Sequence, residues 1–194
     1  MSKRIAFLSA AAFGALALTA AVVAPVSAQD KMMKSEMSGE KTVMVGGAAM
    51  FPSKNIIQNA VNSKDHTTLV AAVKAAGLVE TLEGKGPFTV FAPTNAAFGK
   101  LPAGTVDTLV KPENKPTLTK ILTYHVVPGK LEASSLTDGK KLKTVEGEEL
   151  TVRKSGGKVT IVDAKGGSST VTIPNVNQSN GVIHVIDTVL MPAS

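Results

Sequence analysis

Hydrophobic and polar residues change their spacing near the middle of the chain. Before residue 125, apolar residues recur every three or four positions, which is the period of one face of a helix. From residue 141, apolar and polar residues alternate, as they do in strands with one buried face. Helices followed by antiparallel strands predict an α+β domain. The helical spacing covers residues 54–62, 65–77, 78–84, 94–100, 105–111 and 117–125.

The boundaries of these elements carry their own signals. Asp65 is placed to cap the helix that follows it, and Gly77 is placed to end that helix. Glycine pairs at 156–157 and 166–167 separate alternating segments in the way that hairpin turns do. The last apolar stretch, "GVIHVIDTVLMP" (181–192), is rich in β-branched residues and predicts a strand buried on both faces.

The stretch "FTVFAPTNAAF" (88–98) predicts a sharp corner between a strand and a helix, and such a corner can carry an active site. The buried strand breaks at Pro93, and Thr94 or Asn95 can cap the helix that follows. Phe98 adds apolar area beyond the bend. Because no nucleophilic side chain with a neighbouring base accompanies these residues, we interpret the corner as part of the architecture.

The N-terminal region has the form of an export signal. A positive start, an apolar run over residues 5–24 and the small residues at 26–28 predict a signal peptide over residues 1–28. The alternative is a membrane anchor, since the run approaches the ~20 residues that a span needs. Residues 29–45 predict a flexible tail whose methionines raise copper(I) binding as an alternative to a plain leader. A single folded domain is expected over residues 46–194.

The composition excludes several classes of protein. The chain has no cysteine, which excludes disulfides, thiol catalysis and a lipid-modified cysteine. It has 21 basic and 15 acidic side chains, and the signal peptide holds two of the basic ones, so the mature charge is 19 − 15 = +4. With no tryptophan, one tyrosine and no basic stripe along the sequence, nucleic-acid binding has little support.

The candidate chemistry is sparse. The sequence has no G-x-S-x-G elbow and no phosphate loop that opens a helix, so we predict no enzyme. Of the three histidines, no two stand at the spacing of a helical metal site; zinc held by His125, His184 and a carboxylate stays an alternative. We interpret His184 as a group that donates a hydrogen bond inside or at the rim of the core, and His66 as an exposed residue in the first turn of a helix.

Three stretches together resemble the fasciclin domain family. They are "FTVFAPTNAAF" (88–98), "YHVVPG" (124–129) and "GVIHVIDTVLMP" (181–192), which are similar to the first conserved box, the tyrosine-histidine motif and the second conserved box. The resemblance runs from about Gly46 to Pro192. It implies helices packed around a β-wedge, with the two boxes as adjacent central strands. It also implies no cofactor, no catalysis, and cell adhesion outside the cytoplasm.

The resemblance also suggests site residues. In animal matrix members the tyrosine-histidine motif is linked to integrin binding, and in other members its histidine is thought to hold the fold together. By resemblance, Thr94, Asn95, Phe98, His184 and Asp187 are structural positions of the boxes. Both valines of the motif can equally be core residues. The candidate binding residues carried over from the motif are Tyr124, His125, Val126 and Val127.

We therefore predict a secreted, non-enzymatic adhesion or surface-interaction module, periplasmic or extracellular. The expected partner is a cell-surface or matrix protein or a glycan, and the expected state is a monomer without cofactor, metal or membrane span after signal cleavage. The family pattern is incomplete, because the chain has a single domain and lacks the RGD sequence. The alternative function is an envelope small-molecule or lipid-binding protein, since the apolar content permits a pocket.

Overall fold

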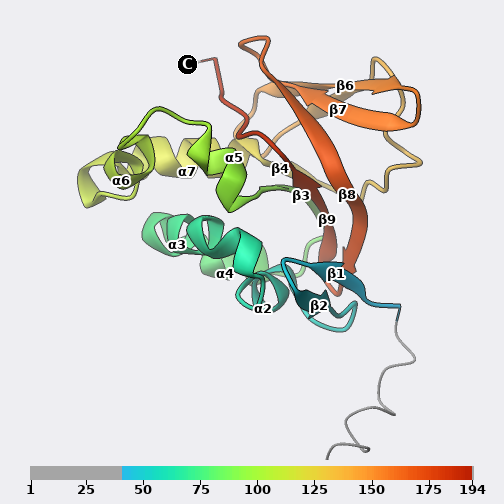
Figure 1. Cartoon of the computed structure of the whole chain (residues 1–194), viewed down its shortest axis with the longest axis horizontal. Helices are drawn as coiled ribbons and strands as arrows, with labels where there is room; N and C mark the ends of the chain where they lie inside the picture. The colour runs from blue at the N-terminus through green and yellow to red at the C-terminus, as the bar shows by residue number, and fades with distance from the viewer. Residues whose placement is uncertain (1–40, 194) are drawn as a thin grey trace, which may run out of the picture. The chain divides into compact units, whose positions relative to one another are not determined.

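A seven-stranded sheet is the frame of the domain (Figure 1). The structure, a computed structural model, describes residues 41–193; the predicted signal peptide and most of the predicted tail lie outside them. The strand order is β4-β3-β9-β8-β7-β6-β5, and only β3 and β9 pair in parallel. The strands are β3 (Phe88–Pro93), β4 (Val126–Pro128), β5 (Lys141–Lys143), β6 (Glu149–Ser155), β7 (Lys158–Val162), β8 (Ser168–Gln178) and β9 (Gly181–Ile186).

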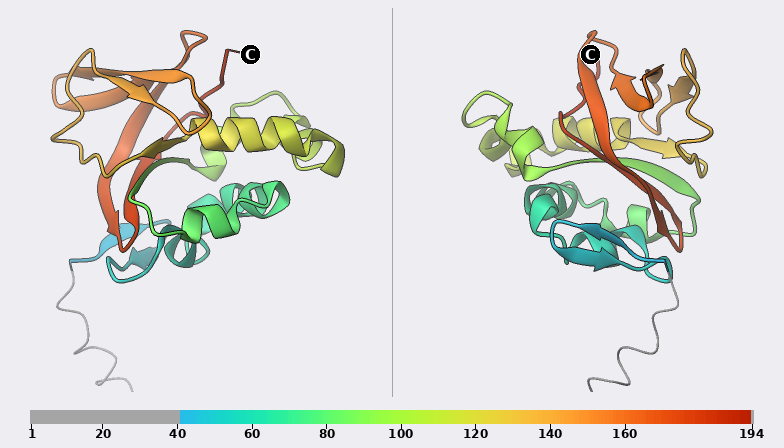
Figure 2. Two further views of the ribbon diagram at one scale, coloured as in Figure 1. Left: turned by 180° about the vertical axis from the view of Figure 1, so that it is seen from behind. Right: turned by 45° about the vertical axis from the view of Figure 1, so that its right-hand side comes forward.

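The sheet curls until its two edges approach each other (Figure 2). Just beyond β5, the Val145 N–H donates to the carbonyl oxygen of Val126 in β4 at 2.8 Å. The long strand β8 changes register twice against β9, and such irregularities bend a strand. The result is the wedge that the resemblance predicts, close to a closed barrel.

Short helices cover one face of the sheet (Figures 1 and 2). Every predicted helix is present, and Gly77 ends α3 with a φ of 73°, a backbone conformation that glycine adopts at little cost. The prediction for Asp65 was wrong: Asp65 lies inside a 3-10 helix, and no side chain of the adjoining residue caps α3. The helices are α2 (Ile56–Ala60), η1 (Lys64–His66), α3 (Thr67–Ala76), α4 (Val79–Glu83), α5 (Asn95–Gly99), α6 (Thr105–Leu109), η2 (Pro112–Asn114) and α7 (Lys115–Tyr124).

A separate hairpin precedes the helices. Strand β1 (Val43–Val45) pairs antiparallel with β2 (Ala48–Met50) around a turn at 46–47. Its Val45 and Met50 are buried in the main core, at 2% and 3% exposure. The last residues of the predicted tail therefore belong to the folded domain, because they supply apolar side chains to it.

Strands β3 and β9 separate two hydrophobic cores. Val90 and Ala92 of β3 point to the core beneath the helices, while Phe91 between them points into the curled sheet. In β9, Ile183 and Val185 join the first core and Ile186 joins the second. All six residues of β9 are buried, as predicted for a strand covered on both faces, but the strand ends at Ile186 and does not extend over the predicted stretch to residue 192. The two boxes are adjacent and in register from Phe88 beside Gly181 to Pro93 beside Ile186.

Candidate functional site

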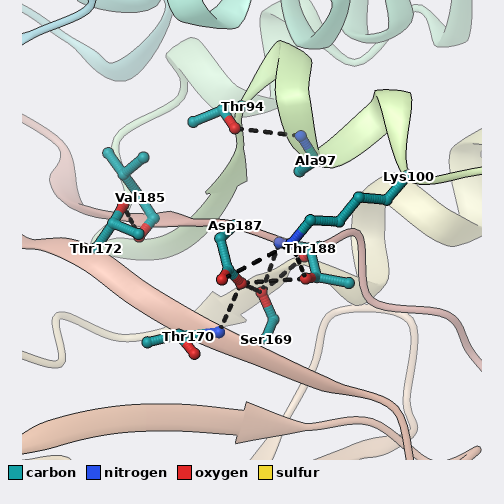
Figure 3. Close-up of polar contacts among 9 residues, drawn as sticks. All are labelled: Thr94, Ala97, Lys100, Ser169, Thr170, Thr172, Val185, Asp187 and Thr188. Carbon is teal, nitrogen blue, oxygen red and sulfur yellow. Dashed lines mark hydrogen bonds and ion pairs between the residues drawn. The ribbon is translucent and has the colours of Figure 1, made fainter.

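The corner after β3 is held by two neighbouring side chains with different tasks. The Thr94 hydroxyl accepts the Ala97 N–H at 3.2 Å and so caps α5 (Figure 3). Asn95 reaches across to the start of α3, where its Oδ1 accepts the Thr68 N–H at 3.0 Å and its Nδ2 donates to the Lys64 carbonyl at 2.8 Å. Asn95 thus supplies from a distance the helix cap that Asp65 was predicted to supply locally. Nothing in these contacts is chemically reactive.

Asp187 anchors a second polar cluster, just beyond the end of β9 (Figure 3). Its carboxylate accepts the Thr170 N–H at 2.9 Å and the Thr188 hydroxyl at 3.1 Å. The Lys100 ammonium lies 3.8 Å from it, in an ion pair that is largely open to solvent. Burial alone would raise the pKa of Asp187, but these hydrogen bonds and the Lys100 charge outweigh it and hold the pKa below its usual value. The cluster joins α5, β8 and β9.

The tyrosine-histidine motif is buried. Tyr124, His125, Val126 and Val127 are exposed by only 0%, 2%, 6% and 3%. Tyr124 and Val127 lie in the core of the curled sheet, and Val126 lies in the helical core. A partner cannot touch these side chains unless the fold opens, so we correct the prediction that they form a contact surface. The alternative reading, in which both valines are core residues, is confirmed.

His125 joins α7 to the segment after β9. Its Nδ1 lies 2.8 Å from the Ile121 carbonyl oxygen, which only accepts, so Nδ1 carries the proton. Nε2 then accepts the Leu190 N–H at 3.0 Å. The neutral ring satisfies both groups, whereas a charged ring would donate from both nitrogens. Burial lowers the pKa of His125 to about 4, against the smaller opposing effect of the hydrogen bond to Ile121.

The Tyr124 hydroxyl has a comparable role at the neighbouring position of the motif. It accepts the Ala164 N–H at 2.9 Å, in the turn between β7 and β8. Burial raises the pKa of Tyr124 to about 12, so the hydroxyl stays protonated at neutral pH. The motif therefore connects the end of α7 to two distant parts of the chain.

His184 is a core residue, as predicted. Its Nε2 lies 2.7 Å from the Leu131 carbonyl oxygen, and its Nδ1 accepts the Asn175 N–H at 3.3 Å. The ring stacks on Phe91 with centroids 5.7 Å apart, and burial lowers its pKa. Because His125 and His184 each engage both ring nitrogens with the backbone, neither has a lone pair for zinc. Within residues 41–193, no three histidine, aspartate or glutamate side chains are arranged to hold a metal ion.

His66 was predicted to be exposed, and this was wrong: it is 3% exposed. Its Nδ1 lies 2.9 Å from the Ser63 hydroxyl, and burial lowers its pKa. The physical reason is the N-terminal hairpin, whose Gly46 carbonyl accepts the Lys64 N–H at 3.2 Å beside this histidine. The burial could not be predicted from the sequence, because the first strand of that hairpin falls within residues 29–45, which were predicted to form a flexible tail.

A buried amide side chain beneath α2, that of Asn180, could not be recognised from the sequence. Asn180 accepts the Ile56 N–H at 3.1 Å and donates to the carbonyls of Leu82 and Gly84 at 2.7 and 3.0 Å. It thereby fixes two helices to the turn before β9. The only sequence signal is an Asn-Gly pair between two strands, which predicts a hairpin turn but gives no hint of these helix contacts.

A small apolar cavity lies between the helices and the sheet. It has a volume of about 30 Å³ and is lined by apolar side chains of α2, α3, α4 and β3, together with His125. Pockets that hold drug-sized ligands measure roughly 300–1,000 Å³. This cavity is therefore much too small for a lipid.

These features define a scaffold domain: a helical layer on a curled sheet, with its motif side chains turned inward. Residues 64–192 match the sequence profile of the fasciclin domain. The Synechocystis protein sll1483 is 52% identical over 153 residues, which cover 79% of this chain and 82% of that protein. The cell surface glycolipoprotein MPB83 of Mycobacterium bovis is 39% identical over 153 residues, 76% of this chain and 64% of its own length.

A solved structure has the same fold. The FAS1 domain pair of the insect cell adhesion molecule Fasciclin I superposes with a TM-score of 0.65 at 19% identity, covering 73% of this chain and 52% of that one. The chain therefore belongs to the fasciclin family. The family is known from adhesion-related proteins, and its domains are generally non-enzymatic. In the part of the chain that the structure describes, no helix has both the length and the apolar character to cross a membrane.

Proposed function

We propose that this chain is an exported, non-enzymatic domain that binds surface or matrix molecules and thereby mediates adhesion. The observation that carries the proposal is the family membership; the burial of Tyr124, His125, Val126 and Val127 leaves contact with a partner to exposed residues elsewhere. The tyrosine-histidine motif and the two boxes serve as the frame in this proposal. Exposed residues on that frame meet the partner, which is a protein or a glycan.

The same proposal places the protein in the periplasm or the extracellular medium. It rests on the export-signal pattern of residues 1–28 and on the name of the relative MPB83, a cell surface glycolipoprotein. Cleavage after Ala28 would release a protein with a short Met-containing tail and one fasciclin domain. N-terminal sequencing of the protein in the periplasmic and medium fractions tests both the cleavage site and the location.

Attachment of a deletion strain to its natural surface tests the adhesive function. We expect the deletion strain to attach less well than the parent, and we expect added purified protein to restore attachment. The control is a folded variant of an exposed helix residue, such as Lys74→Gln, which should restore attachment as well as the wild-type protein does. Parental attachment by the deletion strain would refute the proposal.

The alternative, a lipid or small-molecule carrier, is less well supported because the apolar cavity measures about 30 Å³. Extraction of the purified protein with organic solvent, followed by mass spectrometry, distinguishes the two functions. A stoichiometric lipid in the extract would favour the carrier, and an extract without one would favour adhesion.

A further inference from the structure

The outer face of strands β5, β6 and β7 is open to solvent and positively charged. The inward positions of these strands, such as Leu142, Leu150 and Ile161, fill the core of the curled sheet. The outward positions alternate with them and are exposed or half-buried. β6 and β7 lie at the side of the sheet away from α3 and α6, so these helices do not cover this face (Figures 1 and 2).

Four cations lie on this outward face, and the pairing register sets them in one row. Lys143 and Lys141 are two residues apart on β5, which is about 7 Å along a strand. Lys141 is paired with Thr151, so Arg153 on β6 is its diagonal neighbour, and the pairing of Arg153 with Thr160 makes Lys158 on β7 the next diagonal neighbour. Diagonal neighbours are about 7–8 Å apart. The row crosses three strands and is roughly 20 Å long.

The row is poorly neutralised. Glu149 is the one acidic residue at the outward positions of these three strands, and its carboxylate pairs with the Lys141 ammonium at 3.2 Å. Within residues 41–193, the other three cations of the row have no ion-pair partner. Four positive charges and one negative charge leave +3 on this face, out of +4 for the mature chain. Neighbouring like charges weaken a sheet slightly, so folding gives no reason for the arrangement.

The chemistry of the face selects its partner. Thr151 and Thr160 lie beside the cations, and Thr170 lies next to Thr160 on β8; their hydroxyls can donate and accept hydrogen bonds. No aromatic side chain lies at the outward positions of β5, β6 or β7, so neither a base nor the face of a sugar ring can stack there. The cations and threonines of this face therefore favour an extended partner that presents anions at regular intervals, with hydroxyls between them.

We propose that this face, the row Lys143-Lys141-Arg153-Lys158, binds an acidic polysaccharide that bears carboxylate or sulfate groups. The inference rests on the proposed adhesive function and gives it a partner class and a surface. A linear acidic polysaccharide fits because its charges repeat along one direction, as the row does, and because its hydroxyls match the threonines. An anionic membrane fits less well, because the one apolar side chain at the outward positions of the three strands, Val162, is half-buried and offers little area to enter a bilayer.

The test compares a row variant with a matched control. The row variant carries Lys141→Gln, Lys143→Gln, Arg153→Gln and Lys158→Gln; the control removes the same number of charges from exposed residues on the helical side, by Lys74→Gln, Lys85→Gln, Lys111→Gln and Lys115→Gln. Binding of the purified proteins to alginate, to dextran sulfate and to neutral dextran is measured by calorimetry at low and at physiological salt. Duplex DNA and vesicles containing phosphatidylglycerol serve as the competing polyanions.

We expect the wild type and the control to bind alginate or dextran sulfate but not dextran, with an affinity that falls as salt rises. The row variant should bind about tenfold or more weakly and melt close to the wild type, because it relieves repulsion between neighbouring cations and loses only the exposed ion pair between Lys141 and Glu149. The proposal is overturned if the wild type binds neither acidic polysaccharide, if the control loses as much affinity as the row variant, or if DNA or the vesicles bind more tightly than both polysaccharides.

The attachment assay separates this inference from the proposed function. If the row variant loses polysaccharide binding but still restores attachment to the deletion strain, the adhesive function stands on another face and its link to this row is overturned. If the deletion strain attaches normally while the row binds acidic polysaccharide, the adhesive function fails and the binding face stands.

Discussion

His125 makes folding stability sensitive to mild acid, and this can be measured. In the folded protein its pKa is about 4, whereas an unfolded chain has a histidine pKa of about 6.5. Between these values the unfolded state binds more protons than the folded state, so the free energy of unfolding falls as the pH falls. The stabilisation is fully present above pH 6.5 and is lost progressively down to about pH 4.

The size of the effect follows from the two pKa values. A single group with this shift contributes about 3 kcal/mol in full, and about 2 kcal/mol of it is lost between pH 7 and pH 5. His66 and His184 also have lowered pKa values and act in the same direction. The total loss in the wild type therefore does not isolate His125, but the difference between wild type and a His125 variant does.

Two substitutions remove the titrating ring while each keeps one hydrogen bond. His125→Asn keeps a donor near the Ile121 carbonyl, and His125→Gln keeps an acceptor near the Leu190 N–H. Each leaves one buried group unpaired, which costs about 1–3 kcal/mol at pH 7. Each should then lose about 2 kcal/mol less than the wild type between pH 7 and pH 5.

The assay is urea unfolding, followed by circular dichroism, at a series of pH values from 7 to 5. Tyr124→Phe is the matched control, because it removes a buried hydrogen bond from the neighbouring residue without removing a group that titrates in this range. Its stability should be lower than that of the wild type but should fall with pH in parallel. If the asparagine and glutamine variants also run parallel to the wild type, His125 is not a buried neutral ring and the reasoning is refuted.

Three further predictions concern other parts of the frame, and urea unfolding at pH 7 checks each of them. Asn180→Ala should cost about 3 kcal/mol or more, since it removes three buried hydrogen bonds; a loss under about 1 kcal/mol would show that water replaces them. Gly181→Ala should prevent stable folding, because the added Cβ would overlap the backbone of the adjacent strand, whereas Gly99→Ala has open space and should be neutral; equal effects would contradict the close approach of β3 and β9. Asp187→Ala should destabilise more than Lys100→Gln, because it removes the oxygen that accepts several hydrogen bonds, whereas Lys100→Gln removes only an exposed ion pair at 3.8 Å; the reverse order would refute this.

Much of the fold could be predicted from the sequence, because its signals are local. The helical spacing, Gly77 and the glycine pairs each act within a few residues, and the structure has the helices and hairpins they predict. The failures concern the N-terminal region. Asp65 has the right residue type for a cap, but Asn95 takes that place from 27 residues away along the chain. A contact of this kind depends on how the corner after β3 packs against α3, which no local pattern records.

The candidate site was harder to predict because burial is a property of the whole fold. The sequence showed that Tyr124 and His125 stand between a helix and a strand, and this position was correct. It could not show that a curled sheet closes over Tyr124 or that Leu190 returns to meet the ring of His125. The lysines and the arginine of the row can be read from the sequence, but only the pairing register of β5, β6 and β7 shows that they lie in one row.

The burial of the motif changes where specificity should be sought in this chain. A substitution at His125 or Tyr124 is expected to lower stability, so a loss of adhesion in such a variant must first be tested for unfolding before it is attributed to binding. The outward positions of β5 to β7 behave differently, because alternation keeps their side chains out of both cores. They can change from cation to neutral residue while Leu142, Leu150 and Ile161 still fill the sheet. The fold thus separates the residues that maintain it from a face that can vary with the partner, and it is on that face that a binding variant can be made without a folding defect.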